Sequence, residues 1–474
     1  MSKQILNLKP QYTNYLVDEA KFRGDADSIS FPECKADILA ILQELNKEKV
    51  PVTIQGGKTS IVGSAIPLTG HIMNLSKMNH VLAIDEINST ITVEPGITLT
   101  DLQTVIDEKF LGKNLFWVPQ PTETSATVGG VVSTNAQGIT ADYFGEVKNY
   151  IQSIKLLTYI GKEYEITQGK EIIIQDKKYD LLDIIVGSEG VSGIITELTL
   201  KLSSKAETIW GLTFFFTDKQ VLDSFIHNIQ VNNYDENNAV IVAQEYIDRY
   251  SIDLVEARKN TMEKIKMLPD IEKQFSDIVY VEIQGNEEAI ENVANSLMEM
   301  AEEVGCDIDA IWALCGESEI NKMRAFRHAI SETVNFTIEQ ACIDCLDITK
   351  LGSDMEFPEL DFAQVREFYD SLAKKYNVEY CLFGHLKANH LHFNILAQNK
   401  IDYENGIKLF RELTDFCVAN NGILCSEHGI GKLKAKLLAD KIPVEKINIY
   451  RYLKENYDPE YMFNQNNIVQ EDII

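Results

Sequence analysis

Hydrophobic residues recur along the chain with the spacings of both helices and strands, so the sequence predicts a mixed protein of helices and sheets. Residues 36–45 place an apolar side chain at every third or fourth position, as one face of a helix does. Short apolar runs bounded by Gly, Pro, Asn or Ser are typical of strands. The predicted strands of the first half are 50–54, 91–93, 154–159, 184–186 and 194–202.

The pattern pauses around residues 203–205, and longer helical repeats alternate with short strands after it. The predicted helices of this second region are 254–266, 287–304, 364–376 and 405–419. Such alternation predicts an α+β sheet with helices on one face. We expect a helical lead-in at 1–30, one domain at 31–205 and a second at 206–474.

Three loops rich in Gly, Ser and Thr lie beside predicted strands, at residues 55–60, 119–138 and 186–196. Glycine lets the backbone approach a ligand closely, and successive N–H groups can bind an anion. Three such loops predict a long ligand such as a dinucleotide, although a plain turn remains an alternative for the first loop. A nucleotide-triphosphatase loop is excluded because that motif requires glycine where Val52 stands.

Composition narrows the classes of partner. Forty-four Lys and Arg against 72 Asp and Glu give a net charge of −28, which repels nucleic acid and anionic membranes, so we expect no nucleic-acid partner. The 474 residues are enough for two or three compact units. No apolar stretch reaches membrane-spanning length, and the start lacks a signal-peptide pattern. We therefore expect a cytoplasmic protein whose eight cysteines are reduced.

Residues 383–434 hold four of the eight histidines of the chain. Alternate residues of a strand share a face, so His390, His392 and Asn394 should point one way. The apolar residues between them should point the other way. The apolar face of this strand is therefore predicted to pack in the core, and the face of His390, His392 and Asn394 to carry the chemistry.

A metal site is one interpretation of these histidines. His385 precedes His392 by seven residues across a turn, and Glu427 and His428 add a carboxylate and a further imidazole. Two imidazoles and one carboxylate suit a divalent cation (zinc, manganese or iron) that keeps one position open for a substrate. The alternative is a set of hydrogen-bonded core histidines followed by a plain Glu-His-Gly turn.

The order of the motifs resembles the FAD-linked 2-hydroxyacid dehydrogenases of the vanillyl-alcohol oxidase superfamily. This family includes flavoprotein D-lactate dehydrogenase, D-2-hydroxyglutarate dehydrogenase and the flavin subunit of glycolate oxidase. The resemblance covers residues 18–468, and the order is far more specific than any single motif. The motifs are GGKTSIVGSAIP, VEPG, PQPTETSATVGGVVSTNAQG, DYFGEVKNYIQSIKLL, GSEGVSGIITELTLKL, GHLKANHLHFN, SEHGIGKLK and DPEYMFN.

The resemblance implies an α+β fold with a two-part FAD-binding domain of the vanillyl-alcohol oxidase type at 31–205. An α+β substrate (cap) domain would follow at 206–474, and its C-terminal helical segment would return to the flavin. Lys58 stands where the family has glycine, or histidine when FAD is covalently attached, so the resemblance implies non-covalent FAD. The implied FAD-binding residues are Gln55, Gly56, Gly57, Lys58, Thr59, Ser60, Pro121, Thr122, Thr127, Gly129, Asn135, Gly138, Gly190, Gly193, Ile195 and Asn464.

The resemblance also implies roles at the substrate. His385, His392 and Glu427 match the family's metal ligands. The implied catalytic group comprises His428 as the base, Arg327 as the grip on the substrate carboxylate, Lys350 as a second cation and Asn394 as a substrate contact. An interdomain ion pair is the alternative for Arg327. One departure is the segment 387–390, which reads Lys-Ala-Asn-His where the family has Gly-Asp-Gly-Asn. We interpret His390 as structural and His328 as a helix cap.

The implied activity is metal-assisted oxidation of a D-2-hydroxy acid, D-lactate first, to the 2-oxo acid, with a hydride passing to flavin N5. D-2-Hydroxyglutarate and glycolate are alternative substrates. Two other classes stay open: a non-catalytic flavin electron-transfer subunit, and a sugar or alcohol oxidase. The electron acceptor would be a separate electron-transfer protein, quinone or cytochrome, and a homodimer is compatible with the sequence.

Overall fold

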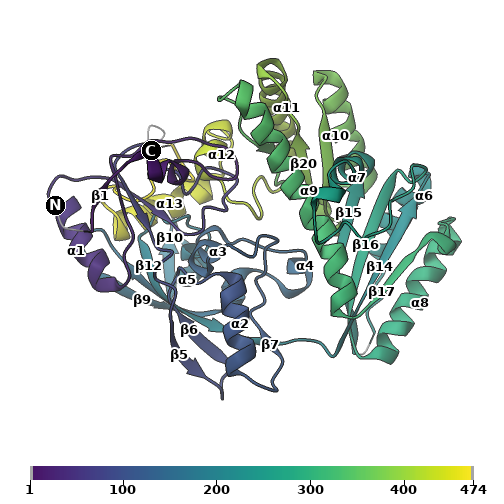
Figure 1. Ribbon diagram of the computed structural model, residues 1–474, viewed down its shortest axis with the longest axis horizontal. Coiled ribbons are helices and arrows are strands. Elements are labelled where there is room, and N and C mark those ends of the chain that lie inside the picture. Colours follow the sequence, from purple (N-terminus) through teal and green to yellow (C-terminus); the bar gives the residue numbers. More distant parts are fainter. Residues whose placement is uncertain (1–3, 237, 471–474) are drawn as a thin grey trace. The chain divides into compact units, whose positions relative to one another are not determined.

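The computed structural model describes residues 4–236 and 238–470 and divides them into two compact units, each described by itself (Figure 1). The first unit comprises 4–138, 146–205 and 427–470. The second comprises Ile139–Gly145 and Ala206–Ser426. The C-terminal stretch from residue 427 thus belongs to the first unit, and the short segment 139–145 belongs to the second.

One sheet of the first unit has four strands among the described residues, in the order β1-β2-β4-β3. Its strands are β1 (Leu6–Asn7), β2 (Ser28–Ser30), β3 (Val52–Gln55) and β4 (His71–Asn74). Both β2 and β3 pair with β4 in parallel. Helix α1 (Lys35–Leu45) confirms the helix predicted at 36–45 and buries its apolar stripe. Residues 4–30 hold a short 3-10 helix, η1 (Pro10–Leu16), and the strands β1 and β2, so the predicted helical lead-in was wrong.

The other main sheet of the first unit, taken over the same described residues, has five antiparallel strands in the order β5-β6-β12-β8-β9. They are β5 (Val81–Asp85), β6 (Thr90–Val93), β8 (Ile151–Leu157), β9 (Glu163–Thr167) and β12 (Ile194–Lys201). The strands predicted at 91–93, 154–159 and 194–202 are confirmed. The strand predicted at 184–186 is wrong, because helix α5 (Leu181–Ile185) begins at Asp180, whose carboxylate accepts a hydrogen bond from Leu182 N.

Shorter elements complete the first unit. The strands are β7 (Leu115–Phe116), β10 (Glu171–Ile174), β11 (Lys177–Asp180) and β13 (Ser203–Ser204). The helices are α2 (Leu99–Lys109), α3 (Val128–Thr134), η2 (Val147–Tyr150), α12 (Gly431–Leu437) and α13 (Val444–Tyr457). Helices α12 and α13 confirm the C-terminal helical segment.

The second unit contains one sheet of seven antiparallel strands within its described residues, in the order β17-β14-β16-β15-β19-β20-β18 (Figure 1). The strands are β14 (Thr208–Phe216), β15 (Ala239–Asp248), β16 (Asp277–Gly285), β17 (Trp312–Cys315), β18 (Leu351–Gly352), β19 (Tyr380–His385) and β20 (His390–Ile395). The short helical turn η5 (Lys387–Asn389) joins β19 to β20.

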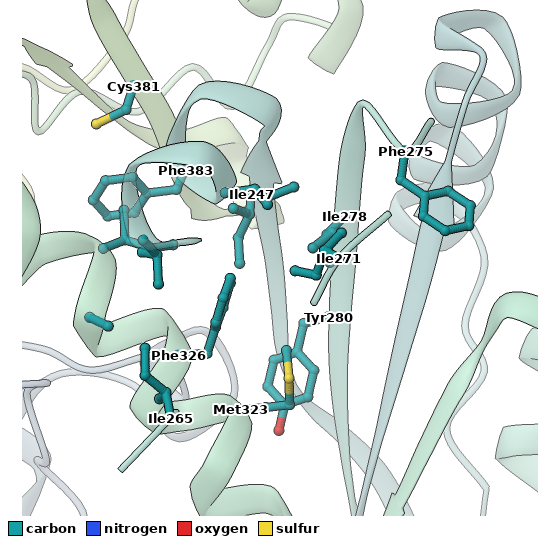
Figure 2. Close-up of a cluster of buried hydrophobic side chains, with 14 of the residues drawn as sticks. Ile247, Ile265, Ile271, Phe275, Ile278, Tyr280, Met323, Phe326, Cys381 and Phe383 are labelled. Atoms are coloured by element: carbon teal, nitrogen blue, oxygen red, sulfur yellow. The ribbon is translucent and has the colours of Figure 1, made fainter. Parts of the chain in front are cut away.

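Helices cover both faces of this sheet, so the prediction of helices on one face was wrong. On one face, Phe215, Tyr280 and Phe326 belong to a buried cluster that includes residues of α7 (Arg249–Glu256) and α9 (Glu317–Asp344). Figure 2 labels Tyr280 and Phe326 of this cluster. On the opposite face, the Phe214 ring lies 4.6 Å from the Phe225 ring of α6 (Lys219–Val231). The cause is the three consecutive phenylalanines 214–216 at the end of β14, since consecutive strand residues point to opposite faces and both faces are then apolar.

Three of the four helices predicted in this unit are confirmed, as α8 (Glu287–Val304), α10 (Phe362–Tyr376) and α11 (Lys400–Ala419). The helix predicted at 254–266 is wrong, because α7 ends at Glu256 and a turn with η3 (Lys259–Thr261) follows. Buried Lys259 organises this turn by donating to Pro269 O and to the Asp270 carboxylate. The remaining helices are α4 (Ala141–Phe144) and η4 (Ile308–Ala310). Across the described part of the chain, no helix combines the length and apolar character that a membrane crossing requires.

Candidate active site

The three glycine-rich loops of the first unit pack directly on one another. A Cβ atom on Gly56 would lie 2.2 Å from Thr127 Oγ1, so the first loop touches the second. Gly187 N of the third loop donates to Val132 O of the second at 3.0 Å, and a Cβ atom on Gly187 would lie 3.2 Å from Asn135 Cβ. Since glycine alone permits approaches this close, the sequence of each loop is matched to its neighbours. These loops form one cradle, which we call the loop cradle (residues 55–60, 119–138 and 186–196).

Helix α3 presents the second loop. The Thr127 hydroxyl accepts a hydrogen bond from Gly130 N at the start of this helix. Asn135 ends it in the left-handed conformation with a φ of 54°. The Oδ1 atom of Asn135 is buried and has no hydrogen-bond partner within residues 4–236 and 238–470. A buried acceptor of this kind fits a polar ligand that donates to it, which FAD could do.

Two predicted FAD-binding residues use their side chains within the protein. The Gln55 amide donates to Tyr15 O at 2.8 Å and to Ala65 O at 2.7 Å. Lys58 Nζ donates to Asn14 O at 2.6 Å and lies 4.5 Å from the centre of the Tyr15 ring. The Lys58 amine is therefore engaged by the N-terminal segment.

Asn464 acts as a bracket between two parts of the cradle. Its Oδ1 accepts from Ile54 N at 2.8 Å, and its Nδ2 donates to Glu189 O at 2.7 Å. The side chain thus joins β3 to the third loop. The other predicted cofactor residues lie in the loops or at the adjoining start of β12: Gly57, Thr59, Ser60, Pro121, Thr122, Gly129, Gly138, Gly193 and Ile195.

Glu189 is a residue that sequence reasoning missed. Its buried carboxylate accepts from Ile430 N at 2.7 Å and from Gly431 N at 2.8 Å, where α12 begins. Burial raises the pKa of Glu189, although these two N–H groups act in the opposite direction. Glu189 therefore ties the third loop to the segment that carries Glu427 and His428.

The hairpin of β19 and β20 gathers three histidines in the second unit. His385 and His390 are paired across it, and the face of His390, His392 and Asn394 is the predicted one. The ring centres of His385 and His392 lie 5.3 Å apart, and those of His390 and His392 lie 4.9 Å apart. Phe393 points to the opposite face and stacks on α10. The predicted division of this strand into two faces is confirmed.

A second carboxylate that the sequence did not reveal lies beside these histidines. Glu245 of β15 is paired in register with His385 and is completely buried. Its Oε1 contacts His385 Nδ1, and its Oε2 accepts from Arg327 Nε at 2.6 Å. Burial raises the pKa of Glu245, but the charges of His385 and Arg327 and their hydrogen bonds outweigh burial and lower it. The one available signal was a glutamate inside the apolar run AVIVAQEYID.

Arg327 is held from two sides. Besides its bond to Glu245, its guanidinium carbon lies 4.4 Å from the centre of the Phe383 ring. Its ion partner Glu245 belongs to the same unit, so the alternative interpretation as an interdomain ion pair was wrong. Among the described residues its two terminal nitrogens make no recorded hydrogen bond, and they form the fork that carboxylates bind.

Lys350 and Asn394 lie together beside Gly352. A Cβ atom on Gly352 would lie 2.8 Å from Asn394 Oδ1 and 3.8 Å from Lys350 Cε. Lys350 Nζ donates to Asn335 Oδ1 of α9 at 2.8 Å. The second unit therefore supplies the two predicted positively charged side chains, Arg327 and Lys350, and the predicted substrate contact Asn394.

The sequence-based interpretations of His390 and His328 have different outcomes. His390 Nε2 lies 3.0 Å from Asp354 Oδ1, and the structural interpretation of His390 stays a prediction. His328 lies in the middle of α9, so its interpretation as a helix cap was wrong. The turn before His390 contains Ala388 and Asn389 with φ angles of 55° and 48°.

Glu427 and His428 belong to the first unit. Glu427 directly follows Ser426, whose N–H donates to Asp354 O at 3.2 Å within the second unit. The His428 side chain is 25% exposed, and its Nε2 lies 3.9 Å from Glu427 Oε2.

Comparison with known families gives two matches along the chain. Residues 26–167 match the family described as FAD binding domain. Residues 231–468, half of the chain, match the family described as FAD linked oxidases, C-terminal domain.

Similar curated proteins span nearly the whole chain. A glycolate oxidase subunit of Bacillus subtilis is 26% identical, covering 95% of this chain and 91% of that one. A D-lactate dehydrogenase of Anaerostipes hadrus is 26% identical, covering 91% and 87%. A D-2-hydroxyglutarate dehydrogenase of Stutzerimonas stutzeri is 23% identical, covering 96% and 97%.

Solved structures share the fold. The 4-ethylphenol oxidase from Gulosibacter chungangensis aligns with a TM-score of 0.72 at 14% identity, covering 100% of this chain and 96% of that one. The p-cresol methylhydroxylase aligns with a TM-score of 0.71 at 14% identity, covering 99% and 94%.

Proposed function

We propose, from the premise that the chain belongs to the family of FAD-linked oxidases, that it oxidises a D-2-hydroxy acid to the corresponding 2-oxo acid. Membership, which the order of motifs predicted, makes the chain an FAD-linked oxidoreductase. The relatives named for glycolate, D-lactate and D-2-hydroxyglutarate support this class of substrate. D-Lactate is the substrate we propose first. The observation that carries the proposal is the buried Arg327, held so that its terminal fork suits a carboxylate.

The loop cradle would bind FAD without a covalent bond. Lys58 stands at the position of the attaching histidine, and its amine is engaged with Asn14 O. The buried Oδ1 of Asn135 fits a donor group of the cofactor. When bound, FAD supplies the hydride acceptor, and the protein supplies orientation and charge.

Arg327 and Lys350 would orient the substrate. A carboxylate pairs with two N–H groups of one guanidinium, which fixes the substrate in the plane of the Arg327 fork. Asn394, beside Lys350, would hydrogen-bond the substrate. His428 is partly exposed, so it would accept the hydroxyl proton at a ring nitrogen and pass it to solvent.

A divalent cation (zinc, manganese or iron) is the second proposed cofactor, with His385, His392 and Glu427 as its ligands. Glu245 accepts from Nδ1 of His385, and this tautomer presents the lone pair of Nε2 to a cation. When bound, such a cation lowers the pKa of a coordinated hydroxyl. The donor set of two imidazoles and one carboxylate fits this role.

D-2-Hydroxyglutarate is the second candidate substrate, and Lys350 favours it. The positively charged side chain of Lys350, near Asn394, would suit the second carboxylate of that acid. The ratio of kcat/KM for D-2-hydroxyglutarate and D-lactate separates the two candidates. A Lys350→Ala variant should lower the ratio if the larger acid is the substrate.

The proposal is tested by anaerobic mixing of the flavoprotein with D-lactate, L-lactate, D-2-hydroxyglutarate, glycolate and glucose. We expect the flavin absorbance to bleach with one of the D-acids or glycolate and to persist with L-lactate and glucose. Persistence with every acid would favour a non-catalytic electron-transfer subunit. Bleaching by glucose alone would favour a sugar oxidase.

An arginine pair on α9 tests the carboxylate grip. Arg327→Ala should raise KM for the acid roughly a hundredfold, since a charged hydrogen-bonded contact contributes about 3 kcal/mol. Arg324, one turn earlier, pairs with Glu282 instead and is the matched control. Equal KM values for the two variants would contradict the role given to Arg327.

A further inference from the structure

The second unit contains a fully buried carboxylate, that of Glu245, which lies between two of the proposed site residues. It lies in the middle of β15 with no exposed surface, inside the central sheet. A buried carboxylate is costly unless each oxygen has a strong partner. Both of its oxygens have one, and the partners are two residues given separate roles above. Oε1 contacts His385 Nδ1, and Oε2 accepts from Arg327 Nε at 2.6 Å.

The contact with His385 determines the state of that ring. A carboxylate only accepts hydrogen bonds, so the neutral His385 ring must carry its proton on Nδ1. The lone pair is then on Nε2, the nitrogen that can coordinate a cation. Register pairing of Glu245 with His385 across β15 and β19 fixes the geometry through the backbone.

The contact with Arg327 determines the direction of the guanidinium. Nε is engaged by Glu245, and the flat face lies over the Phe383 ring at 4.4 Å (Phe383 is labelled in Figure 2). Because Glu245 fixes the Nε edge of the guanidinium and Phe383 fixes its flat face, the two terminal nitrogens of Arg327 can point in one direction only. The same carboxylate therefore orients the proposed cation ligand and the proposed carboxylate grip.

We propose that Glu245 is a positioning residue that couples the cation site to the substrate-carboxylate site. This inference rests on the proposed function, since it gives both neighbours their roles from that proposal. Glu245 would act through these two neighbours, since both of its carboxylate oxygens are engaged by them. Its loss should weaken two separate binding events at once, although neither ligand contacts the missing group.

The same sheet provides a matched control in the pair of Glu282 and Arg324. Glu282 is equally buried, and its carboxylate accepts from Arg324 Nε at 2.8 Å and from Tyr280 OH at 2.9 Å. Its partner Arg324 is also an arginine of α9 and lies three residues before Arg327. Among the described residues, no histidine is hydrogen-bonded to Glu282. Replacing Glu282 therefore tests the cost of losing one buried acid without changing the proposed sites.

The test compares Glu245→Gln, Glu282→Gln and Glu245→Asp as FAD-loaded full-length proteins. Glutamine keeps the shape but has one acceptor and one donor, so it cannot accept from both Arg327 and His385. After treatment with a chelator, zinc and manganese affinities are measured by competition with a chromophoric chelator. KM and kcat are measured with whichever acid bleaches the wild type.

We expect Glu245→Gln to bind both metals about 10–100-fold more weakly than wild type. Its KM for the acid should rise more than tenfold at saturating metal, while its FAD content should match that of Glu282→Gln. Glu245→Asp, which keeps two acceptor oxygens, should recover part of both losses.

Wild-type metal affinity and KM in Glu245→Gln would overturn the inference, as would equal losses in Glu282→Gln. A change in one property alone would also overturn it, because coupling requires both. Should Glu245→Gln fail to fold, the Glu245→Asp measurements decide between the same outcomes. A wild type that neither binds metal nor bleaches with any acid would instead contradict the proposed function, and the inference with it.

Discussion

The two units build their candidate sites in different ways. In the first unit the loop cradle depends on backbone approach, and the side chains of Gln55, Lys58 and Asn464 hold loops in place. In the second unit the candidate site consists of side chains that orient one another, with Glu245 between Arg327 and His385. On the proposed function, the first design would recognise a long ligand by shape. The second would recognise small charged groups by direction.

The largest expected effect tests the shape-based design. In Gly56→Val the new side chain would meet Thr127 Oγ1, since a Cβ atom alone would already lie 2.2 Å from it. Displacing the second loop should cost about 3 kcal/mol, roughly a hundredfold in FAD affinity. The measurement is flavin absorbance per chain after dialysis.

Gly169→Ala is the control for this experiment. Gly169 has a φ of +84°, and nothing lies within 4 Å of the position that a Cβ atom would take there. The variant should suffer backbone strain but retain FAD. Equal FAD loss in both variants would mean that general destabilisation, and not the cradle, is responsible.

A pH experiment tests the buried imidazole of His71 in the first unit. Unlike His385, which faces a carboxylate, His71 lies between the Ser28 and Ser30 hydroxyls, 2.8 Å from each. Burial lowers the pKa of His71 from 6.5 to about 4. Between these values the unfolded chain binds the extra proton, so stability falls as pH drops from 6.5 to 4.

The free energy of unfolding should fall by about 3 kcal/mol across this pH range. Urea unfolding of wild type and of His71→Gln at each pH measures this loss. The variant should show a flatter acid limb. Identical slopes for both proteins would show that the His71 pKa does not differ between the folded and unfolded states.

Asn464→Ala should have a moderate effect on the first unit. Its removal leaves Ile54 N without its partner, while Glu189 O still accepts from Asn467 Nδ2 at 3.1 Å. One buried donor left unsatisfied costs about 2 kcal/mol. The midpoint temperature of unfolding (Tm), monitored by flavin release, should therefore be lower than in wild type. A Tm at the wild-type value would show that water replaces the amide.

The smallest effect concerns the turn in the second unit. Ala388 has a φ of 55°, where a Cβ atom is strained. Ala388→Gly should raise the free energy of unfolding by about 1 kcal/mol or less, because the relief of strain in the folded state is partly offset by the freedom that the unfolded chain gains. Ala363→Gly, in helix α10, makes the same chemical change in a helical residue and should destabilise. Urea unfolding measures both, and a shared sign would contradict the argument.

The sequence predicted the elements that depend on local spacing. Alternation placed His390, His392 and Asn394 on one face, and the loop motifs indicated the cradle. It could not reveal Glu245, because the pairing of this glutamate with His385 spans 140 residues and depends on strand register. The short run 184–186 was assigned to the wrong element because periodicity cannot distinguish a short buried strand from a helix turn.

The Asn464 bracket has a consequence for biosynthesis. The hydrogen bond from Ile54 N to its side chain closes a loop of 410 residues, so nearly the whole polypeptide must leave the ribosome before the loop cradle is complete. On the proposed function we expect flavin insertion to be a late event, so that nascent chains stalled before this asparagine would emerge colourless.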